Sequence, residues 1–71
     1  MEVDTKKIVY FQYTNYKGES QLRRVIPNEI WFGRSEFHDG EQWFLRALDL
    51  DKSDFRNFAM KEIKEWKREV L

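Results

Sequence analysis

The residues with the most distinctive binding chemistry in this sequence are arginines in the middle of the chain, whereas lysines dominate its two ends. A guanidinium offers a flat fork of N–H donors that can hold a phosphate or carboxylate through two hydrogen bonds. The arginines that could form such an anion-binding patch are Arg23, Arg24, Arg34, Arg46 and Arg56.

Aromatic residues are interleaved with two of these arginines, Arg34 and Arg46. Rings beside cations can stack on the bases of single-stranded nucleic acid, but large rings also fill the core of a small domain. Both interpretations stay open for Trp31, Phe32, Trp43 and Phe44.

Catalytic and metal-binding patterns are weak. His38 is the only histidine and the chain has no cysteine, so no nucleophile–base set and no thiolate metal site can be assembled. The segment 49–54 spaces oxygens as a calcium loop does, but Asp54 stands where glycine is needed, and Met60 where glutamate is needed. We therefore expect no enzymatic activity, no metal and no cofactor.

Charge and hydropathy limit the partners. The 13 basic and 13 acidic residues cancel, which argues against general electrostatic attraction to nucleic acid. No run approaches the roughly 20 apolar residues of a membrane span, and the N-terminal residues lack the apolar stretch of a signal peptide. We expect no membrane partner and a cytoplasmic location.

The elements that must position these side chains are mostly strands. With 71 residues, 17% of them aromatic, the chain predicts one β-rich domain over residues 1–71. Runs of β-branched and aromatic residues predict strands at about 6–14, 19–26, 29–34 and 41–48. A turn with Gly18 joins the first two, and Pro27 is expected to end the second because proline cannot donate to a strand ladder.

Two interpretations remain open for the C-terminal part. Apolar residues near a 3.6-residue period favour one helix from about residue 54 onwards. The alternative is a fifth strand at about 55–60, followed by a helix at about 61–70 with Ile63, Trp66 and Val70 as its apolar stripe.

Three segments in order resemble the WYL domain, which is named after a Trp-Tyr-Leu triplet on a strand of a small Sm-like, SH3-type barrel. Here the triplet stands as Trp43-Phe44-Leu45. The segment 23–30 is similar to the family's basic residue, proline and later aliphatic residue. Phe55-Arg56-Asn57-Phe58, with Ile63 five residues on, looks like its Arg-x-Phe signature and trailing isoleucine.

The resemblance implies a mainly β fold, a five-stranded antiparallel Sm-like barrel with a C-terminal α-helix, and it favours the strand at 55–60. It also implies a pocket for anionic ligands, and Arg23, Phe44 and Arg56 match the pocket positions, with the adjacent Arg24 as second choice. Arg46, interleaved with the aromatic residues, completes the predicted set. Phe44 stands in place of the family's tyrosine, so a hydroxyl that could bind a ligand is missing.

The chain is similar to the short, free-standing members found in phage genomes, for which the location is the host cytoplasm. We expect a non-enzymatic regulatory or accessory domain that binds single-stranded nucleic acid or a nucleotide. The alternative is a protein–protein interaction module that modulates a host or regulatory protein without nucleic-acid contact, favoured by the zero net charge and the missing tyrosine.

The apolar side chains of the predicted strands indicate that the chain associates with itself. Strand 41–48 carries apolar side chains on both faces, and exposed apolar side chains favour association. We expect a homodimer or higher oligomer, with Trp66 as the contact if the helix is involved.

Overall fold

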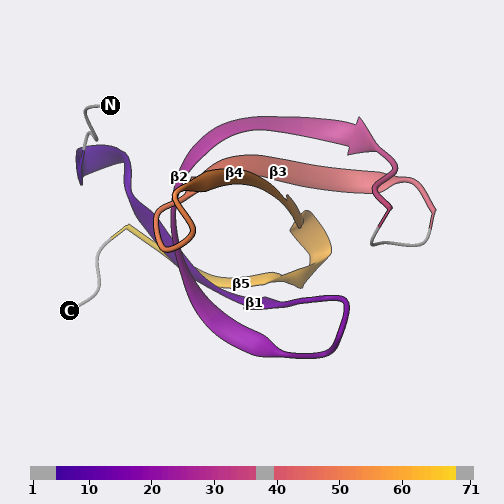
Figure 1. The fold of residues 1–71 in the computed structure, drawn as a ribbon, viewed down its shortest axis with the longest axis horizontal. Coiled ribbons are helices and arrows are strands. Elements are labelled where there is room, and N and C mark those ends of the chain that lie inside the picture. The colour runs from indigo at the N-terminus through magenta and orange to yellow at the C-terminus, as the bar shows by residue number, and fades with distance from the viewer. Residues whose placement is uncertain (1–4, 37–39, 69–71) are drawn as a thin grey trace.

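The computed structural model describes residues 5–36 and 40–68 as one five-stranded antiparallel sheet with two short 3-10 turns (Figure 1). The strand order is β4-β3-β2-β1-β5. The elements are η1 (Thr5–Lys7), β1 (Val9–Thr14), β2 (Ser20–Gly33), β3 (Gln42–Asp49), β4 (Asp54–Ala59), η2 (Met60–Glu62) and β5 (Ile63–Lys67).

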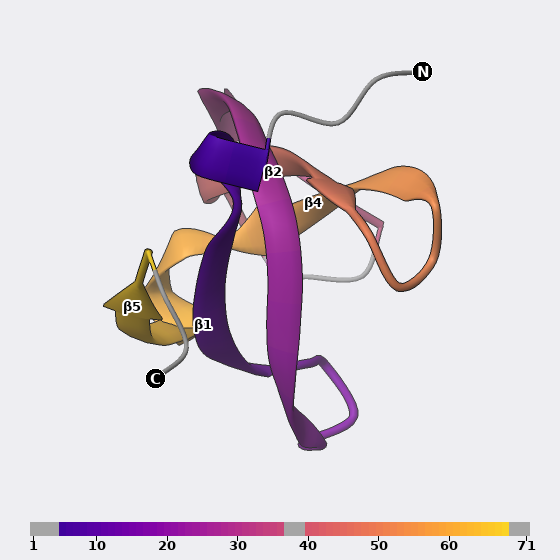
Figure 2. The same cartoon turned by 90° about the vertical axis from the view of Figure 1, so that its left-hand side faces the viewer.

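The long strand β2 takes part in both halves of the sheet. Its first half pairs with β1 up to Val25, and from Val25 onwards it pairs with β3. Figure 2 shows it running the height of the molecule beside β1. The prediction that Pro27 ends a strand is wrong, because β2 continues through it. The register shifts between Pro27 and Glu29, and such an irregularity is where a strand tolerates a residue that cannot donate.

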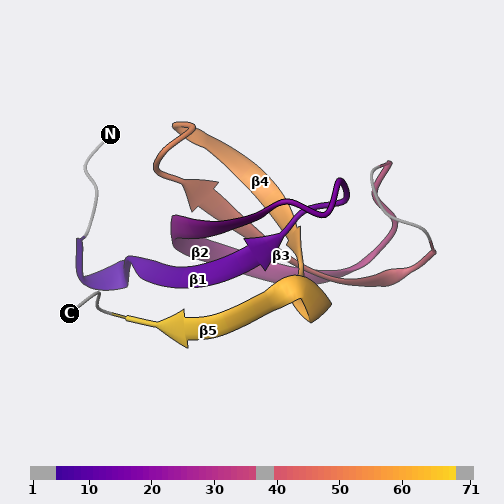
Figure 3. The same ribbon diagram turned by 90° about the horizontal axis from the view of Figure 1, so that it is seen from below.

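The helix predicted at about 61–70 is wrong for the described residues of that segment. The strand predicted at about 55–60 is confirmed as β4, but the described part of segment 61–70 is the end of η2 and strand β5. β5 lies along β1 (Figure 3), where Tyr13 faces Ile63 and Tyr10 faces Lys67. Pairing with an otherwise open strand edge outweighed the helical periodicity. Val70 and Leu71 lie outside the described residues.

The sheet is strongly bent but open. The two outer strands, β4 and β5, are joined by η2 and are not neighbours in the sheet, so a closed barrel is not confirmed. The concave side holds the core, which is built by alternate residues of each strand. The buried members of this core are Val9, Phe11, Tyr13, Val25, Leu45, Ala47 and Phe58.

The first hairpin turn is confirmed and is fixed by Asn15. Its side-chain Oδ1 accepts hydrogen bonds from the backbone N–H groups of Lys17 and Glu19, at 2.9 and 3.0 Å. Gly18 adopts a φ of 83°, a conformation that residues with a Cβ rarely adopt. His38 lies outside the described residues.

Candidate functional site

A cavity of about 180 Å³ lies between the end of the first hairpin and β4. Its lining combines two arginines with aromatic and amide side chains from β1, the turn after it, β2 and β4. The lining residues are Tyr13, Asn15, Tyr16, Arg23, Arg56, Asn57 and Phe58. The fold therefore brings together Arg23 and Arg56, which are far apart in the sequence.

The alternation of buried and exposed residues along β2 shows which of the two adjacent arginines, Arg23 or Arg24, lines the cavity. Arg23 lies on the buried side of the strand with Val25, whereas Arg24 is exposed. The Arg24 guanidinium forms an ion pair at 3.3 Å with Asp51, which is also exposed. Arg23 is therefore the cavity residue, and Arg24 lies outside the site.

Arg23 is a buried cation with an incomplete set of partners. Only 7% of the residue is exposed, and its Nη1 lies 3.7 Å from Oδ2 of the fully buried Asp49. Its Nε has no hydrogen-bond partner among the described residues. Asp49 is itself held in place, since its Oδ1 accepts hydrogen bonds from the backbone N–H groups of Asp51 and Lys52. The site thus contains a fixed guanidinium with unused donor capacity, and a buried donor gains strongly from a partner.

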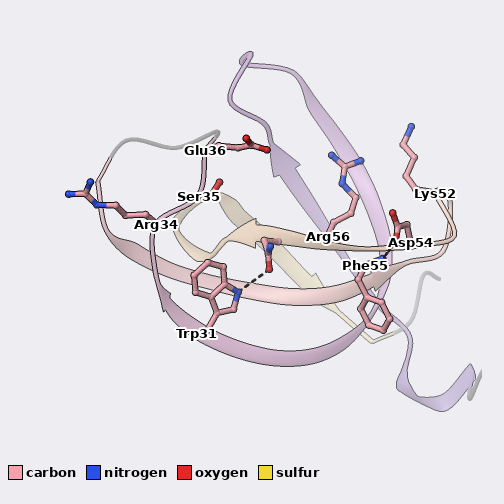
Figure 4. A pocket seen from close by; sticks show the side chains of 9 residues that line it. Trp31, Arg34, Ser35, Glu36, Lys52, Asp54, Phe55 and Arg56 are labelled. Carbon is pink, nitrogen blue, oxygen red and sulfur yellow. Dashed lines mark hydrogen bonds between the residues drawn. The ribbon is translucent and has the colours of Figure 1, made fainter.

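Arg56 supplies the exposed cation of the cavity. It lies opposite Ala47 in the ladder between β3 and β4, which places it on the core side of the sheet. In Figure 4 its side chain points to one side of β4, while Phe55 points to the other. The exposed Arg56 and the buried Arg23 give the cavity two positive charges, against the buried carboxylate of Asp49.

Tyr13 presents a neutral hydroxyl group to this cavity. Burial raises the pKa of Tyr13 above its ordinary value. A hydrogen bond donated by the backbone N–H of Ala59 at 2.9 Å opposes this rise, as do the charges of Arg23 and Arg56, while Glu62 adds to it. The hydroxyl therefore keeps its proton and can donate a hydrogen bond to a ligand atom.

A second, larger and open groove of about 650 Å³ lies along β4, and Arg56 and Asn57 line both hollows. The Trp31 indole N–H donates a 2.9 Å hydrogen bond to Asn57 Oδ1 in this groove (Figure 4). Three cationic and two acidic side chains surround these aromatic and amide groups. The lining residues are Trp31, Arg34, Ser35, Glu36, Lys52, Asp54, Phe55, Arg56 and Asn57.

Two predicted site residues, Phe44 and Arg46, do not line the cavity. Phe44 is fully buried and stacks on Trp31, with ring centroids 4.7 Å apart. The Arg46 guanidinium lies 4.2 Å from the centre of the Phe55 ring. Their neighbour Leu45 faces Phe58 in the core, and successive residues of a strand point to opposite faces. Phe44 and Arg46 are therefore on the far side of the sheet.

Sequence reasoning missed several groups of the site. The sequence places Asp49 only in the calcium-like segment 49–54, and Tyr13 only in the strand predicted at about 6–14. The signal for Tyr13 was its alternation with Val9 and Phe11, which places all three on one face. Asn15, Tyr16 and Asn57 carry no such signal, because only the folded sheet brings turn and strand together.

The described residues contain neither a membrane-spanning helix nor a metal-binding cluster, and a family model identifies the chain. Among the described residues, no helix is long and apolar enough to span a membrane, and no cluster of three or more His, Asp or Glu side chains could hold a metal ion. No curated protein matches the chain. The family model described as the WYL domain matches residues 3–68, and domains of this kind are generally ligand-sensing or regulatory. The chain therefore belongs to the WYL-domain family.

Proposed function

We propose that this chain is a non-enzymatic regulatory domain that binds an anionic ligand in the cavity lined by Arg23 and Arg56, with single-stranded nucleic acid as the ligand. The observation that carries the proposal is that Arg23 and Arg56, far apart in the sequence, line one cavity. Arg23 and Asp49 are only loosely paired, at 3.7 Å, and neither Nε of Arg23 nor Oδ2 of Asp49 has a hydrogen-bond partner among the described residues. Buried polar groups are nearly always satisfied, so Arg23 keeps donor capacity for an anionic group in this cavity.

The size of the cavity limits what enters it. Pockets that hold whole small-molecule ligands measure about 300–1,000 Å³, whereas this cavity measures about 180 Å³. It accommodates a compact anionic group, such as one backbone phosphate, rather than a whole nucleotide. Arg23, Arg56 and the Tyr13 hydroxyl are the donors for that group.

The adjoining groove explains why a polymer is preferred over a single anion. Arg56 and Asn57 belong to both hollows, so a strand anchored at Arg23 reaches the groove by passing Arg56 and crossing the edge strand β4. There Phe55, 38% exposed, offers a base the ring face that Arg46 does not cover, and Arg34 and Lys52 offer cations for further phosphates. Stacking and phosphate contacts in alternation are how single strands are held without sequence preference.

A titration of labelled single-stranded oligonucleotides at low salt tests the proposal. We expect binding with a dissociation constant of ~100 µM or tighter that weakens steadily as salt is added, because phosphate contacts release counterions. Double-stranded DNA of the same length serves as the control and should bind more weakly, since its bases cannot stack on Phe55. An unchanged anisotropy over the whole titration would refute nucleic-acid binding and favour the protein-interaction alternative.

A further inference from the structure

The end of the β2–β3 hairpin carries an exposed apolar patch that the proposed ligand site does not use. Ile30, Phe32 and Trp43 are 58%, 52% and 56% exposed. Phe32 and Trp43 lie opposite each other in the ladder, with ring centroids 5.3 Å apart. Ile30 lies two residues before Phe32 and so shares its face. With roughly 100 Å² exposed on each side chain, the patch reaches the roughly 300 Å² at which exposed apolar surface on a monomer is often functional.

The same segment has an open strand edge. β1 pairs with β2 only as far as Val25, and beyond that residue β2 pairs with β3 on one side. On its other side, no described residue pairs with β2 between residues 28 and 33. Figure 1 shows this part of β2 as the outermost strand of the sheet. Pro27 and the register shift after it protect the beginning of this edge, but residues 30–33 carry no proline and no charged side chain.

We propose that this edge binds a second copy of the chain, with the two β2 strands antiparallel about a twofold axis at Trp31. In that register Ile30 lies opposite Phe32 of the partner subunit, and the sheet continues from one chain into the other. The two apolar side chains on either side of Trp31 make the strand complementary to itself, as a twofold interface requires.

Register and area both favour a second copy over an unrelated partner. In the proposed register the exposed Glu29 lies opposite Gly33 of the partner subunit and the exposed Arg34 lies opposite Asn28 of the partner subunit, so the pairing opposes no like charges. The two patches together offer up to roughly 600 Å² of apolar surface, and the paired backbones with Trp31 and Arg34 add to this, against the roughly 1,000 Å² that a specific interface needs. Trp66 is the contact expected from the sequence if a helix is involved. It lies on β5 and stacks on Phe11 of its own chain, with ring centroids 5.7 Å apart.

Light scattering coupled to size exclusion, over a wide range of protein concentration, tests the proposal. The full chain should move from the mass of one chain, 8.8 kDa, to twice that mass as concentration rises. The double variant I30K/F32K places lysine opposite lysine and should remain at the mass of one chain. The variant I30K/F32E places lysine opposite glutamate in the proposed register and should recover the doubled mass.

The matched control is L22K. Leu22 is also an aliphatic residue of β2 and is 52% exposed, but it lies outside the patch. This variant should dimerise as the unmodified chain does. Hydrogen exchange adds a readout that needs no substitution: the amides of residues 28–33 should exchange more slowly at high concentration. A constant mass of one chain, or a dimer that persists in I30K/F32K, would overturn the proposal. Dimer loss in both double variants would overturn the register.

Discussion

The guanidinium of Arg23 and the carboxylate of Asp49 face each other inside the protein, with Nη1 and Oδ2 3.7 Å apart and both side chains buried. This distance is long for a charge-assisted hydrogen bond, so the carboxylate balances the charge of Arg23 without using all of its donors. Asp49 is anchored by the turn that follows β3. The pair therefore holds Arg23 in place at the cavity.

The first prediction concerns this pair. Asp49→Asn keeps an oxygen for the backbone N–H groups of Asp51 and Lys52 but removes the negative charge, which leaves Arg23 buried and unbalanced. We expect the free energy of unfolding, measured in urea, to fall by about 3–5 kcal/mol. The double variant R23Q/D49N should be more stable than the sum of the two single losses predicts. Simple additivity would show that the two groups do not interact.

The raised pKa of Tyr13 predicts how the free energy of unfolding depends on pH. Its folded-state pKa is raised above the ordinary value of 10.0, mainly by burial, so the folded state favours the neutral hydroxyl. This contribution to stability is complete below pH 10 and is lost as pH rises through the folded pKa. Urea unfolding of the unmodified chain should show that loss, and Tyr13→Phe should show less of it.

The same substitution has an effect at neutral pH. Tyr13→Phe removes the acceptor of the Ala59 backbone N–H and should lower the unfolding free energy by about 1–3 kcal/mol. Tyr16→Phe is the control, because Tyr16 is 59% exposed and its loss should change stability little. Equal pH profiles for the two variants would contradict the assignment to Tyr13.

Phe44 tests whether the missing tyrosine matters for ligand binding in this chain. Phe44→Tyr places a hydroxyl on the face of the sheet that carries Trp31, away from the cavity. We expect oligonucleotide affinity to stay within about twofold, while burial of an added polar group lowers stability by about 1–3 kcal/mol. A clear gain in affinity in the anisotropy titration would show that Phe44 reaches the ligand after all.

The strands could be predicted from the sequence because their residue types alternate or are β-branched over short runs. The path of β2 through Pro27 could not, because a strand accommodates proline where its partner shifts register, and the partner is set by the whole sheet. Nor could β5, since Ile63 and Trp66 suit a helix and a strand equally well and the open edge of β1 decides between them.

Only part of the candidate site could be predicted from the sequence, because the faces of the strands are set by the whole sheet. Arg23 and Arg56 were identified by resemblance, and the fold places both at one cavity. The choice between Arg23 and Arg24, and the exclusion of Phe44 and Arg46, depend on which face of each strand is concave. Alternation within a strand defines two faces but does not say which one encloses the core.

The central claim, that the cavity of Arg23 and Arg56 is the binding site, is tested most directly by comparing two arginine substitutions. Arg56→Gln removes an exposed arginine that lines the cavity, and Arg24→Gln removes an exposed arginine outside it. The measurement is the dissociation constant of a labelled oligothymidine of about 12 nucleotides for each variant and for the unmodified chain. Our account predicts a loss of about tenfold or more for R56Q and a change within about twofold for R24Q. Equal effects of the two substitutions, or a larger loss for R24Q, would contradict it.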